Sequence, residues 1–138
     1  PDILDDQVNS ISKILLKYKV SAIIISNTTD VNREVLQNIL KHQKGGLSGK
    51  PLEQRSNLMI NKFYNLLKGK IEIIGVGGVD SGKSAYEKFL AGASYVQLYT
   101  GMVFQGPNIV AKIKKELKEI LTNDGVKNFK EIIGKNSH

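Results

Sequence analysis

The chain of 138 residues is 41% hydrophobic, which suffices for one folded domain with one core and argues against disorder. It contains no Cys, and its two His, His42 and His138, lack metal-ligand spacing, so we expect neither disulfides nor a metal site. The formal net charge is +7, but the densest lysines share a helical segment with glutamates, which favours a solvated helix face over a nucleic-acid surface: Lys112, Lys114, Lys115, Lys118, Glu116 and Glu119. No apolar run approaches the ~20 residues that cross a bilayer, and no targeting segment is recognisable.

The first half of the chain is predicted to form a helix, a strand and a long connection. Residues 5–18 indicate a helix, because acidic residues suit its start and an apolar stripe follows at helical spacing: Val8, Ile11, Ile14, Leu15 and Tyr18. The β-branched run at 21–26 is typical of a strand covered on both faces. Residues 27–30 have turn chemistry, and the polar connection over 31–50 has a length that is uncommon without a function.

The second half is predicted to alternate between helices and strands. Strand patterns occur at 71–74 and 94–99. Helical patterns occur over 58–67, 81–90, 102–104, 109–121 and 129–133. Gly69 is predicted to cap the first of these helices, Gly92 follows the second, and Pro107 lies near the start of the long one.

Strands that alternate with helices predict a parallel sheet built from βαβ units. Three strands are too few to close such a sheet, whereas a (β/α)8 TIM barrel closes with eight strands in about 250 residues. We therefore expect an α/β fold in which residues 1–138 are the C-terminal half of one TIM-barrel domain, with strands 6–8 and their helices. The sequence does not begin with Met, so we take it as a piece of a larger protein whose N-terminal half is absent. Half a barrel exposes strand edges, so the isolated chain is expected to be insoluble or to pair with the other half.

Two neighbouring strand ends carry residues suited to binding an anion. The backbone amides of Gly77 and Gly78 can approach a ligand closely because neither residue has a side chain. Tyr99, Thr100 and Gly101 stand where the last strand gives way to a short helix, and helix starts attract phosphate. Barrel enzymes often bind phosphate with the loops after strands seven and eight. The alternative is that the glycines only permit tight turns; agreement between two adjacent strand ends favours a phosphate site.

A rival hypothesis comes from the same stretch. Residues 77–84 match the P-loop pattern Gly-x-x-x-x-Gly-Lys-Ser, which predicts a nucleotide phosphohydrolase that uses Gly77 to Ser84. The following helix is short, and neither the next strand nor the preceding ones end in an Asp that could hold magnesium. These departures disfavour the P-loop. A third hypothesis, a non-enzymatic basic binding module, rests on net charge alone.

Five short motifs, taken together, resemble the dihydroorotate dehydrogenases. They occur in order and in register: Ser-Asn-Thr-Thr at 26–29, Gly-Gly-Leu-Ser-Gly-Lys-Pro-Leu at 45–52, Ile-Gly-Val-Gly-Gly-Val at 74–79, Ala-Gly-Ala at 91–93 and Val-Gln-Leu-Tyr-Thr at 96–100. The second motif and the ending Glu-Ile-Ile-Gly at 131–134 are similar to the quinone-dependent, membrane-associated type. The resemblance covers essentially the whole chain. Each motif alone is weak, and the set is specific.

The resemblance implies an FMN-binding barrel that oxidises (S)-dihydroorotate to orotate in pyrimidine biosynthesis, with ubiquinone as electron acceptor. It implies that Asn27 and Thr28 bind the polar edge of the pyrimidine, where an ordinary Asx or Thr turn is the alternative. It also assigns FMN contacts to Ser26, Ser48, Gly49, Gly77, Gly78, Tyr99 and Thr100. Another FMN-binding TIM-barrel oxidoreductase remains an alternative, separated from this one by the Asn27-Thr28 pair and the 45–52 segment.

The resemblance also implies what this chain lacks. The catalytic base, a Ser, is expected upstream, so no catalytic residue is assigned to this chain, and a flavin-contacting Lys is expected just before Pro1. The helices that lead quinone to the flavin and dock on the membrane belong to the same upstream region. We therefore expect this piece to be inactive alone and the whole protein to lie at the mitochondrial inner membrane.

Overall fold

The computed structural model describes residues 1–31 and 33–136, so His138 lies outside the described residues. The elements are the helices α1 (Asp5–Lys17), α2 (Glu53–Leu67), α3 (Gly82–Ala91), α4 (Thr100–Gln105) and α5 (Ile109–Asn123), the strands β1 (Ala22–Ile25), β2 (Glu72–Val76) and β3 (Tyr95–Gln97), and the 3-10 helices η1 (Arg33–Val35), η2 (Lys50–Leu52) and η3 (Phe129–Ile132). This order is the predicted alternation of helices and strands.

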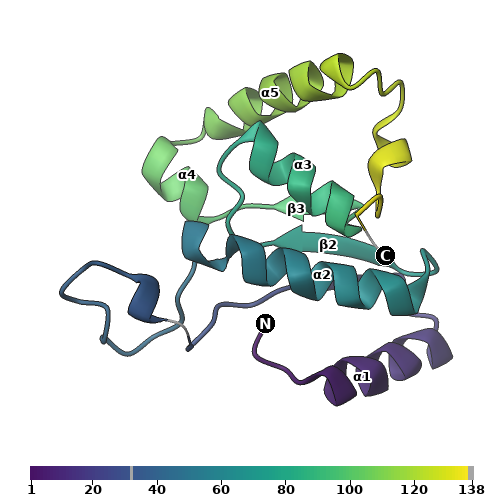
Figure 1. Cartoon of the computed structure of the whole chain (residues 1–138), viewed down its shortest axis with the longest axis horizontal. Helices are drawn as coiled ribbons and strands as arrows, with labels where there is room; N and C mark the ends of the chain where they lie inside the picture. Colours follow the sequence, from purple (N-terminus) through teal and green to yellow (C-terminus); the bar gives the residue numbers. More distant parts are fainter. Residues whose placement is uncertain (32, 137–138) are drawn as a thin grey trace.

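The three strands form one parallel sheet in the order β1-β2-β3. Ile25 at the end of β1 pairs with Gly75, and Gln97 at the end of β3 pairs with Val76, so the carboxyl ends of all three strands meet at one edge of the sheet. Figure 1 shows α4 and the long connection after β1 on this same side of the molecule. The parallel register therefore brings together segments that are far apart in the sequence.

The sheet is covered by helices on one face. α1 packs on α2, α2 on α3 and α3 on α5, and Figure 1 shows α2 and α3 crossing the sheet on the same side. Ile73 points into this layer and is buried, whereas Ile24 is 57% exposed. The prediction that the first strand is covered on both faces is therefore wrong for this chain, because no described segment packs on the second face of β1.

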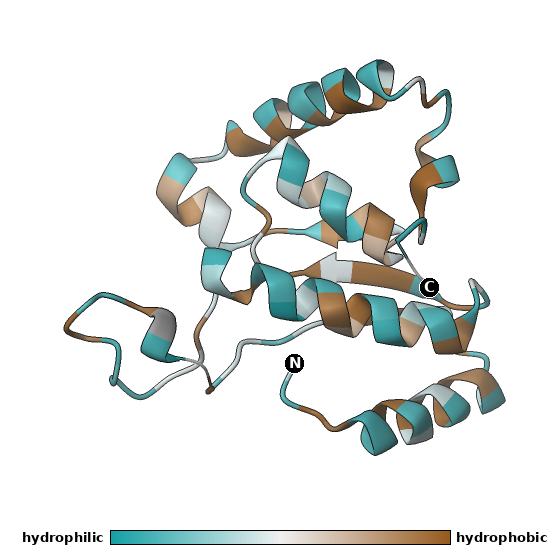
Figure 2. Cartoon of the chain, viewed as in Figure 1, coloured by the Kyte–Doolittle hydropathy of each residue, from teal (hydrophilic) through white to brown (hydrophobic). Residues whose placement is uncertain are grey.

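Two apolar clusters hold the helices to the sheet and to one another. The first joins α1, α2 and the sheet, and its members are Val8, Ile25, Met59, Ile60, Phe63, Leu67, Ile71, Ile73, Ala91 and Ala93. The second joins α3, α5 and η3, and its members are Val79, Ala85, Phe89, Ile109, Ile113 and Ile132. Met59, Phe63 and Leu67 recur every four residues, which is why α2 presents one apolar face (Figure 2). Burial of each large apolar side chain stabilises the fold by about 1.5–3 kcal/mol.

Three predicted element ends differ from the structure. α2 begins at Glu53, earlier than predicted, because η2 turns the chain directly into it. Its left-handed cap is Lys68 (φ 49°), and the predicted cap Gly69 is the next residue, also at positive φ (70°). β3 ends at Gln97, before the predicted Tyr99, because the chain bends away from the sheet to start α4.

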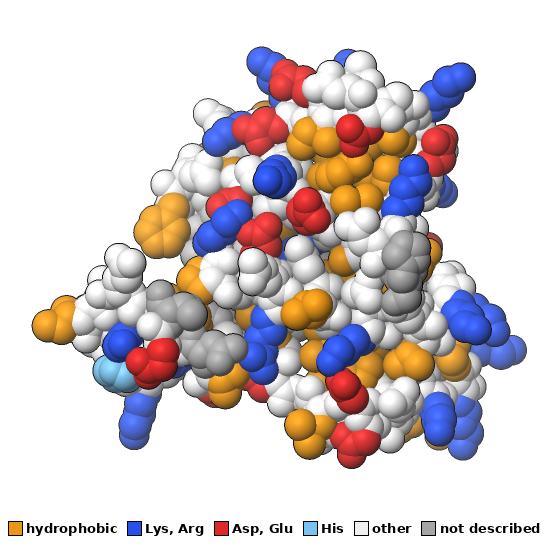
Figure 3. Space-filling view, in the orientation of Figure 1, with side chains coloured by type: hydrophobic (Ala, Val, Ile, Leu, Met, Phe, Trp, Pro, Cys, Tyr) orange, Lys and Arg blue, Asp and Glu red, His pale blue; other side chains and the backbone are white. Residues whose placement is uncertain are grey.

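The lysine-rich segment is a solvated helix face, as predicted. Lys112, Lys114, Lys115 and Lys118 are all exposed on α5. Figure 3 shows blue side chains projecting from the top of the molecule, where Figure 1 places α5. The opposite face of α5 carries Ile109 and Ile113, which are buried. Within residues 1–31 and 33–136, no helix combines the length and hydropathy that a membrane crossing requires.

Candidate functional site

A cavity of ≈ 890 Å³ opens at the carboxyl ends of the three strands. All nine residues that the sequence singled out for binding line it: Ser26, Asn27, Thr28, Ser48, Gly49, Gly77, Gly78, Tyr99 and Thr100. Cavities of this size are typical of cofactor and small-molecule sites in α/β proteins, which lie at the same edge of the sheet. The structure therefore gathers the predicted residues from four separate segments into one site.

One end of the cavity is lined by hydroxyl groups and backbone amides. Ser48 Oγ and Thr100 Oγ1 lie 2.9 Å apart and share a hydrogen bond, which joins the long connection to the start of α4. Thr100 is in the first turn of α4, where backbone N–H groups have no partner within the helix. Gly77 and Gly78 follow β2 at φ 108° and 78° and carry no side chain that would cover their amides. This donor set suits a phosphate.

The other end is formed by the segment after β1. The Ser26 amide donates to the Val76 carbonyl at 3.2 Å, which keeps the end of β1 next to the end of β2. The Ile25–Ser26 peptide bond is cis. The Thr28 amide donates to Asn27 Oδ1 at 2.8 Å, so part of the expected turn alternative is present. This bond uses the carbonyl oxygen of the Asn27 side chain and leaves its NH2 group as a donor.

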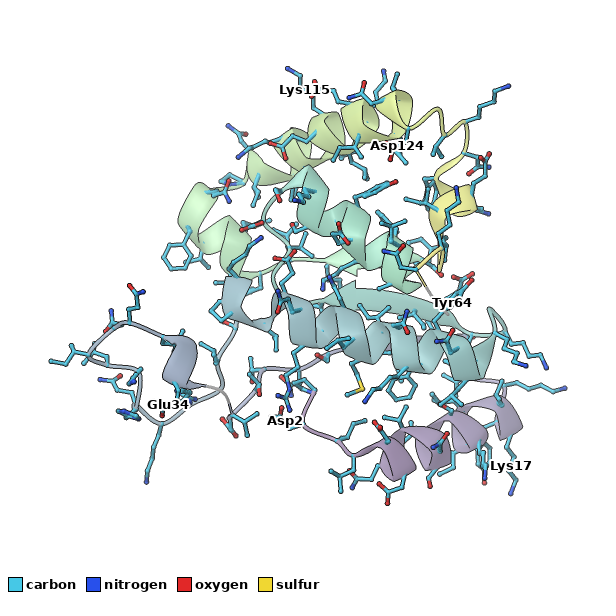
Figure 4. All side chains as sticks on the ribbon, viewed as in Figure 1. Asp2, Lys17, Glu34, Tyr64, Lys115 and Asp124 are labelled. Atoms are coloured by element: carbon cyan, nitrogen blue, oxygen red, sulfur yellow. The ribbon has the colours of Figure 1, made fainter. Side chains whose placement is uncertain are left out.

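Asp2 fixes this segment from outside the cavity. Its carboxylate accepts hydrogen bonds from Thr29 Oγ1 at 2.7 Å and from the Asp30 amide at 3.1 Å, and it pairs with Arg55 at 3.0 Å. Burial raises the pKa of Asp2, but the hydrogen bonds from Thr29 and Asp30 and the Arg55 charge outweigh it, so the pKa lies below its ordinary value. Figure 4 shows Asp2 beside the connection that follows β1. Asp2 could not be identified from the sequence, because its partners are distant in the chain.

The long connection is closed at its base and returns to the cavity. Thr29 and Leu47 exchange backbone hydrogen bonds of 3.1 and 2.8 Å. Inside this closure, the Arg33 guanidinium donates to the carbonyls of Lys41, Gln43 and Gly45. The closure directs the following residues, Ser48 and Gly49, toward α4. The prediction that this connection has a function is consistent with its place at the site.

Sequence reasoning missed a charged group at the cavity wall. Lys50 Nζ lies 2.6 Å from Glu53 Oε2 and 3.5 Å from Asp80 Oδ1, and Lys50 and Asp80 both line the cavity. The hydrogen bond to Glu53, supported by both carboxylate charges, raises the pKa of Lys50, so it stays protonated. The sequence feature that could have identified Lys50 is its place directly after Gly49 in the motif at 45–52.

The P-loop hypothesis fails on the packing of α3. The Gly82 amide, which would face a phosphate in a P-loop, donates to Glu116 Oε2 at 2.6 Å. Ser84 is buried and its Oγ accepts from the amides of Asp80 and Ser81, so this hydroxyl caps the helix and is not free to hold a metal ion. A carboxylate thus occupies the helix start that a triphosphate would need.

The motifs and the fold agree with one known family. The family model described as dihydroorotate dehydrogenase matches residues 1–121 of this chain. The chain belongs to the dihydroorotate dehydrogenase family. Curated relatives include the mitochondrial dihydroorotate dehydrogenase (quinone) of Mus musculus, which is 45% identical over 97% of this chain. They also include the dihydroorotate dehydrogenase (quinone) of Vibrio cholerae, which is 47% identical over 85% of this chain.

A solved structure of ligand-free DHODH from Eimeria tenella matches the fold of this dihydroorotate dehydrogenase chain. The TM-score is 0.95 at 36% identity, and the match covers 99% of this chain and 38% of that one. This match confirms the predicted fold class, a part of an α/β barrel enzyme. The chain spans about a third of the length of its curated relatives, with 34% of the Mus musculus protein and 35% of the Vibrio cholerae protein covered.

Proposed function

We propose that the protein to which this chain belongs oxidises (S)-dihydroorotate to orotate with FMN as cofactor and a quinone as electron acceptor, in pyrimidine biosynthesis. The observation that supports this most is the convergence of nine motif residues on one cavity in a chain of the dihydroorotate dehydrogenase family. In this proposal, residues 1–138 are the C-terminal part of a single FMN-binding barrel domain. They supply the binding site for the FMN phosphate and part of the substrate site.

The residues present fit FMN. Its phosphate suits the end of the cavity lined by the amides of Gly77 and Gly78 and by Ser48, Tyr99 and Thr100, because backbone N–H groups and hydroxyls are the donors that phosphate oxygens accept. Lys50 adds a protonated amine to the same wall, where it is paired with Glu53 and with Asp80. Bound FMN supplies the two-electron acceptor that the oxidation requires.

The substrate end is assigned to Asn27 and Thr28. The edge of a pyrimidine dione alternates carbonyl acceptors with N–H donors, and an Asn side chain offers both kinds of group. Both residues are exposed to the cavity, while Thr29 next to them is buried and tied to Asp2. Asp2 and the Thr29–Leu47 closure therefore position the pair without contacting the substrate themselves.

Replacing Thr100 by Val is expected to weaken FMN binding by about tenfold. The change keeps the shape of the side chain and removes the hydroxyl that Ser48 Oγ contacts at 2.9 Å, so one phosphate donor is lost and another loses its partner. Titration of the full-length apoprotein with FMN measures the effect. Thr122→Val on α5, whose hydroxyl donates to the Lys118 carbonyl, is the matched control and should bind FMN as the wild type does. Unchanged affinity in Thr100→Val would remove this residue from the phosphate site.

The proposed reaction is tested on the full-length protein by its absorbance. Purified protein should carry a flavin spectrum, which should bleach on addition of dihydroorotate without oxygen and return when a quinone is added. A flavin spectrum that does not respond to dihydroorotate but bleaches with another reductant would identify a different FMN-dependent barrel enzyme. Absence of bound flavin after reconstitution with FMN would overturn the proposal.

We also infer that the whole protein uses ubiquinone and associates with the mitochondrial inner membrane through its N-terminal region. The relatives from Mus musculus and Arabidopsis thaliana carry the words quinone and mitochondrial in their names. Fractionation of cells that express the full-length protein with an epitope tag tests the location, and a soluble cytosolic distribution would contradict it.

A further inference from the structure

The most deeply buried charged side chain of the described residues is Lys88 on α3. Its side chain is 0% exposed, and its ammonium donates to Ser56 Oγ at 3.0 Å and to Asn57 Oδ1 at 2.8 Å, both on α2. Burial lowers the pKa of Lys88 to about 8, with the charge of Glu53 acting in the opposite direction. No described carboxylate forms a salt bridge with this ammonium. A buried charge held only by neutral oxygens is costly to the fold.

The contacts of Lys88 lead to the wall of the flavin cavity. Its stem passes under β2, where a Cβ built on Gly75 would lie 3.1 Å from Lys88 Cδ. Ser56 Oγ, which accepts from Lys88, donates to the Val76 carbonyl at 2.6 Å. The same carbonyl accepts the Ser26 amide at 3.2 Å. One carbonyl therefore links the buried ammonium, through Ser56, to the ends of both β1 and β2.

Seen from the cavity, the Lys88 ammonium also lies behind Gly77 and Gly78, at the end of the cavity proposed for the phosphate. A Cβ built on Gly77 would lie 3.4 Å from Ser56 Cβ, so Ser56 is directly behind the Gly77 backbone, and Lys88 is bonded to Ser56. Gly77 lines the cavity, whereas Lys88 and Ser56 do not. A positive charge in this place acts on an anion in the cavity through low-dielectric protein rather than through water, which preserves its effect.

We propose that Lys88 is a positioning residue for the FMN phosphate: through Ser56 it holds the Val76 carbonyl and the start of the Gly77-Gly78 turn, and its charge favours the bound dianion. This inference rests on the proposed function. It adds to that function a residue outside the cavity that acts on the phosphate and not on the flavin ring.

A purely structural role for Lys88 makes a different prediction. A Met side chain has similar length and volume, and its lack of charge removes the desolvation cost of the buried ammonium, which offsets the hydrogen bonds that Ser56 Oγ and Asn57 Oδ1 lose. If Lys88 serves the phosphate site, Lys88→Met should therefore bind the phosphate less well without a loss of stability. If Lys88 only holds α3 to α2, the same change should lower stability and affect every ligand alike.

The test compares FMN with riboflavin, which lacks the phosphate, on full-length apoprotein. Lys88→Met is expected to lose about tenfold in FMN affinity, with riboflavin affinity and the apoprotein Tm at or above wild-type values. Ser56→Ala, which keeps the charge and cuts the link to Val76, should lose about threefold for FMN alone. Lys83→Met is the matched control: it makes the same change of charge at an exposed position of α3 and should leave both affinities unchanged.

Three outcomes would overturn the inference: equal FMN affinity in Lys88→Met and wild type, an equal loss for FMN and riboflavin, or a loss in Lys83→Met as large as in Lys88→Met. A variant that loses Tm together with both affinities would assign Lys88 to the fold. Failure of the proposed function is recognised separately on the wild-type protein, which would then either bind neither flavin or hold a flavin that dihydroorotate does not bleach.

Discussion

Replacing Gly78 by Ala is expected to lower the affinity of the protein for FMN by about a hundredfold or more. Gly78 follows β2 at φ 78°, a conformation that L side chains adopt only with strain. A Cβ there would also lie 2.7 Å from Glu53 Cα and 3.0 Å from Glu53 N, so the start of α2 has to move. Glu53 is the first residue of α2, Lys50 lies in η2 directly before it, and Gly78 lines the end of the cavity proposed for the phosphate, so the movement is expected to displace the proposed phosphate donors.

The measurement is FMN titration of the full-length apoprotein, together with its thermal unfolding. Gly125→Ala is the matched control, since Gly125 has a similar φ of 68° and nothing within 4 Å of its added Cβ. Both variants carry the backbone strain, and only Gly78→Ala carries the clash with α2. Equal FMN affinity in the two variants would show that this close contact does not shape the site.

Replacing Asn27 by Asp is expected to raise KM for dihydroorotate by about a hundredfold while FMN stays bound. The two side chains have the same shape, but Asp has no N–H donor and brings a negative charge. Dihydroorotate is itself a carboxylate, so the variant site loses a hydrogen bond to the pyrimidine edge and repels the substrate. Loss of a hydrogen-bond donor that a substrate requires is among the larger specificity effects known in enzymes.

Steady-state kinetics of the full-length protein measure this change, and the flavin absorbance of the purified variant checks that cofactor binding is intact. Asn9→Asp, on the exposed surface of α1, introduces the same charge far from the cavity and should behave as the wild type does. If Asn27→Asp kept its KM, the side chain would be only a turn former, and the Thr28 amide bond to Asn27 Oδ1 would be its whole role.

The fold and the cavity lining could be predicted because they follow from local patterns. Each strand was predicted from a short run with a strand pattern, and parallel strands bring their carboxyl ends to one edge whatever the details of packing. Ser26, Gly77 and Tyr99 each stand at or just beyond the predicted end of such a run, so a correct order of elements was enough to bring them together. The boundaries were harder: Lys68, whose amide donates to the Tyr64 carbonyl, caps α2, and the predicted cap Gly69 is the next residue.

Residues that act through distant contacts could not be predicted. Asp2 and Lys88 have ordinary sequence neighbours, and their importance comes from Thr29, Arg55 and Ser56, which only the fold brings near. The P-loop pattern failed for the complementary reason. Its residues are all present, but Glu116 on α5 fills the helix start, and a pattern within one segment contains no information about a residue that packs on it.

The burial of Lys88 makes it a natural reporter on this part of the barrel. Reagents that acylate lysine amines need solvent access, which the exposed lysines of α5 have and Lys88 lacks while α2 and α3 stay packed. The rate at which Lys88 is covalently labelled, measured by mass spectrometry, therefore reports on the separation of these two helices. Because the exposed lysines of α5 react rapidly, the slower labelling of Lys88 gives the rate at which α2 and α3 separate, and no engineered probe is needed.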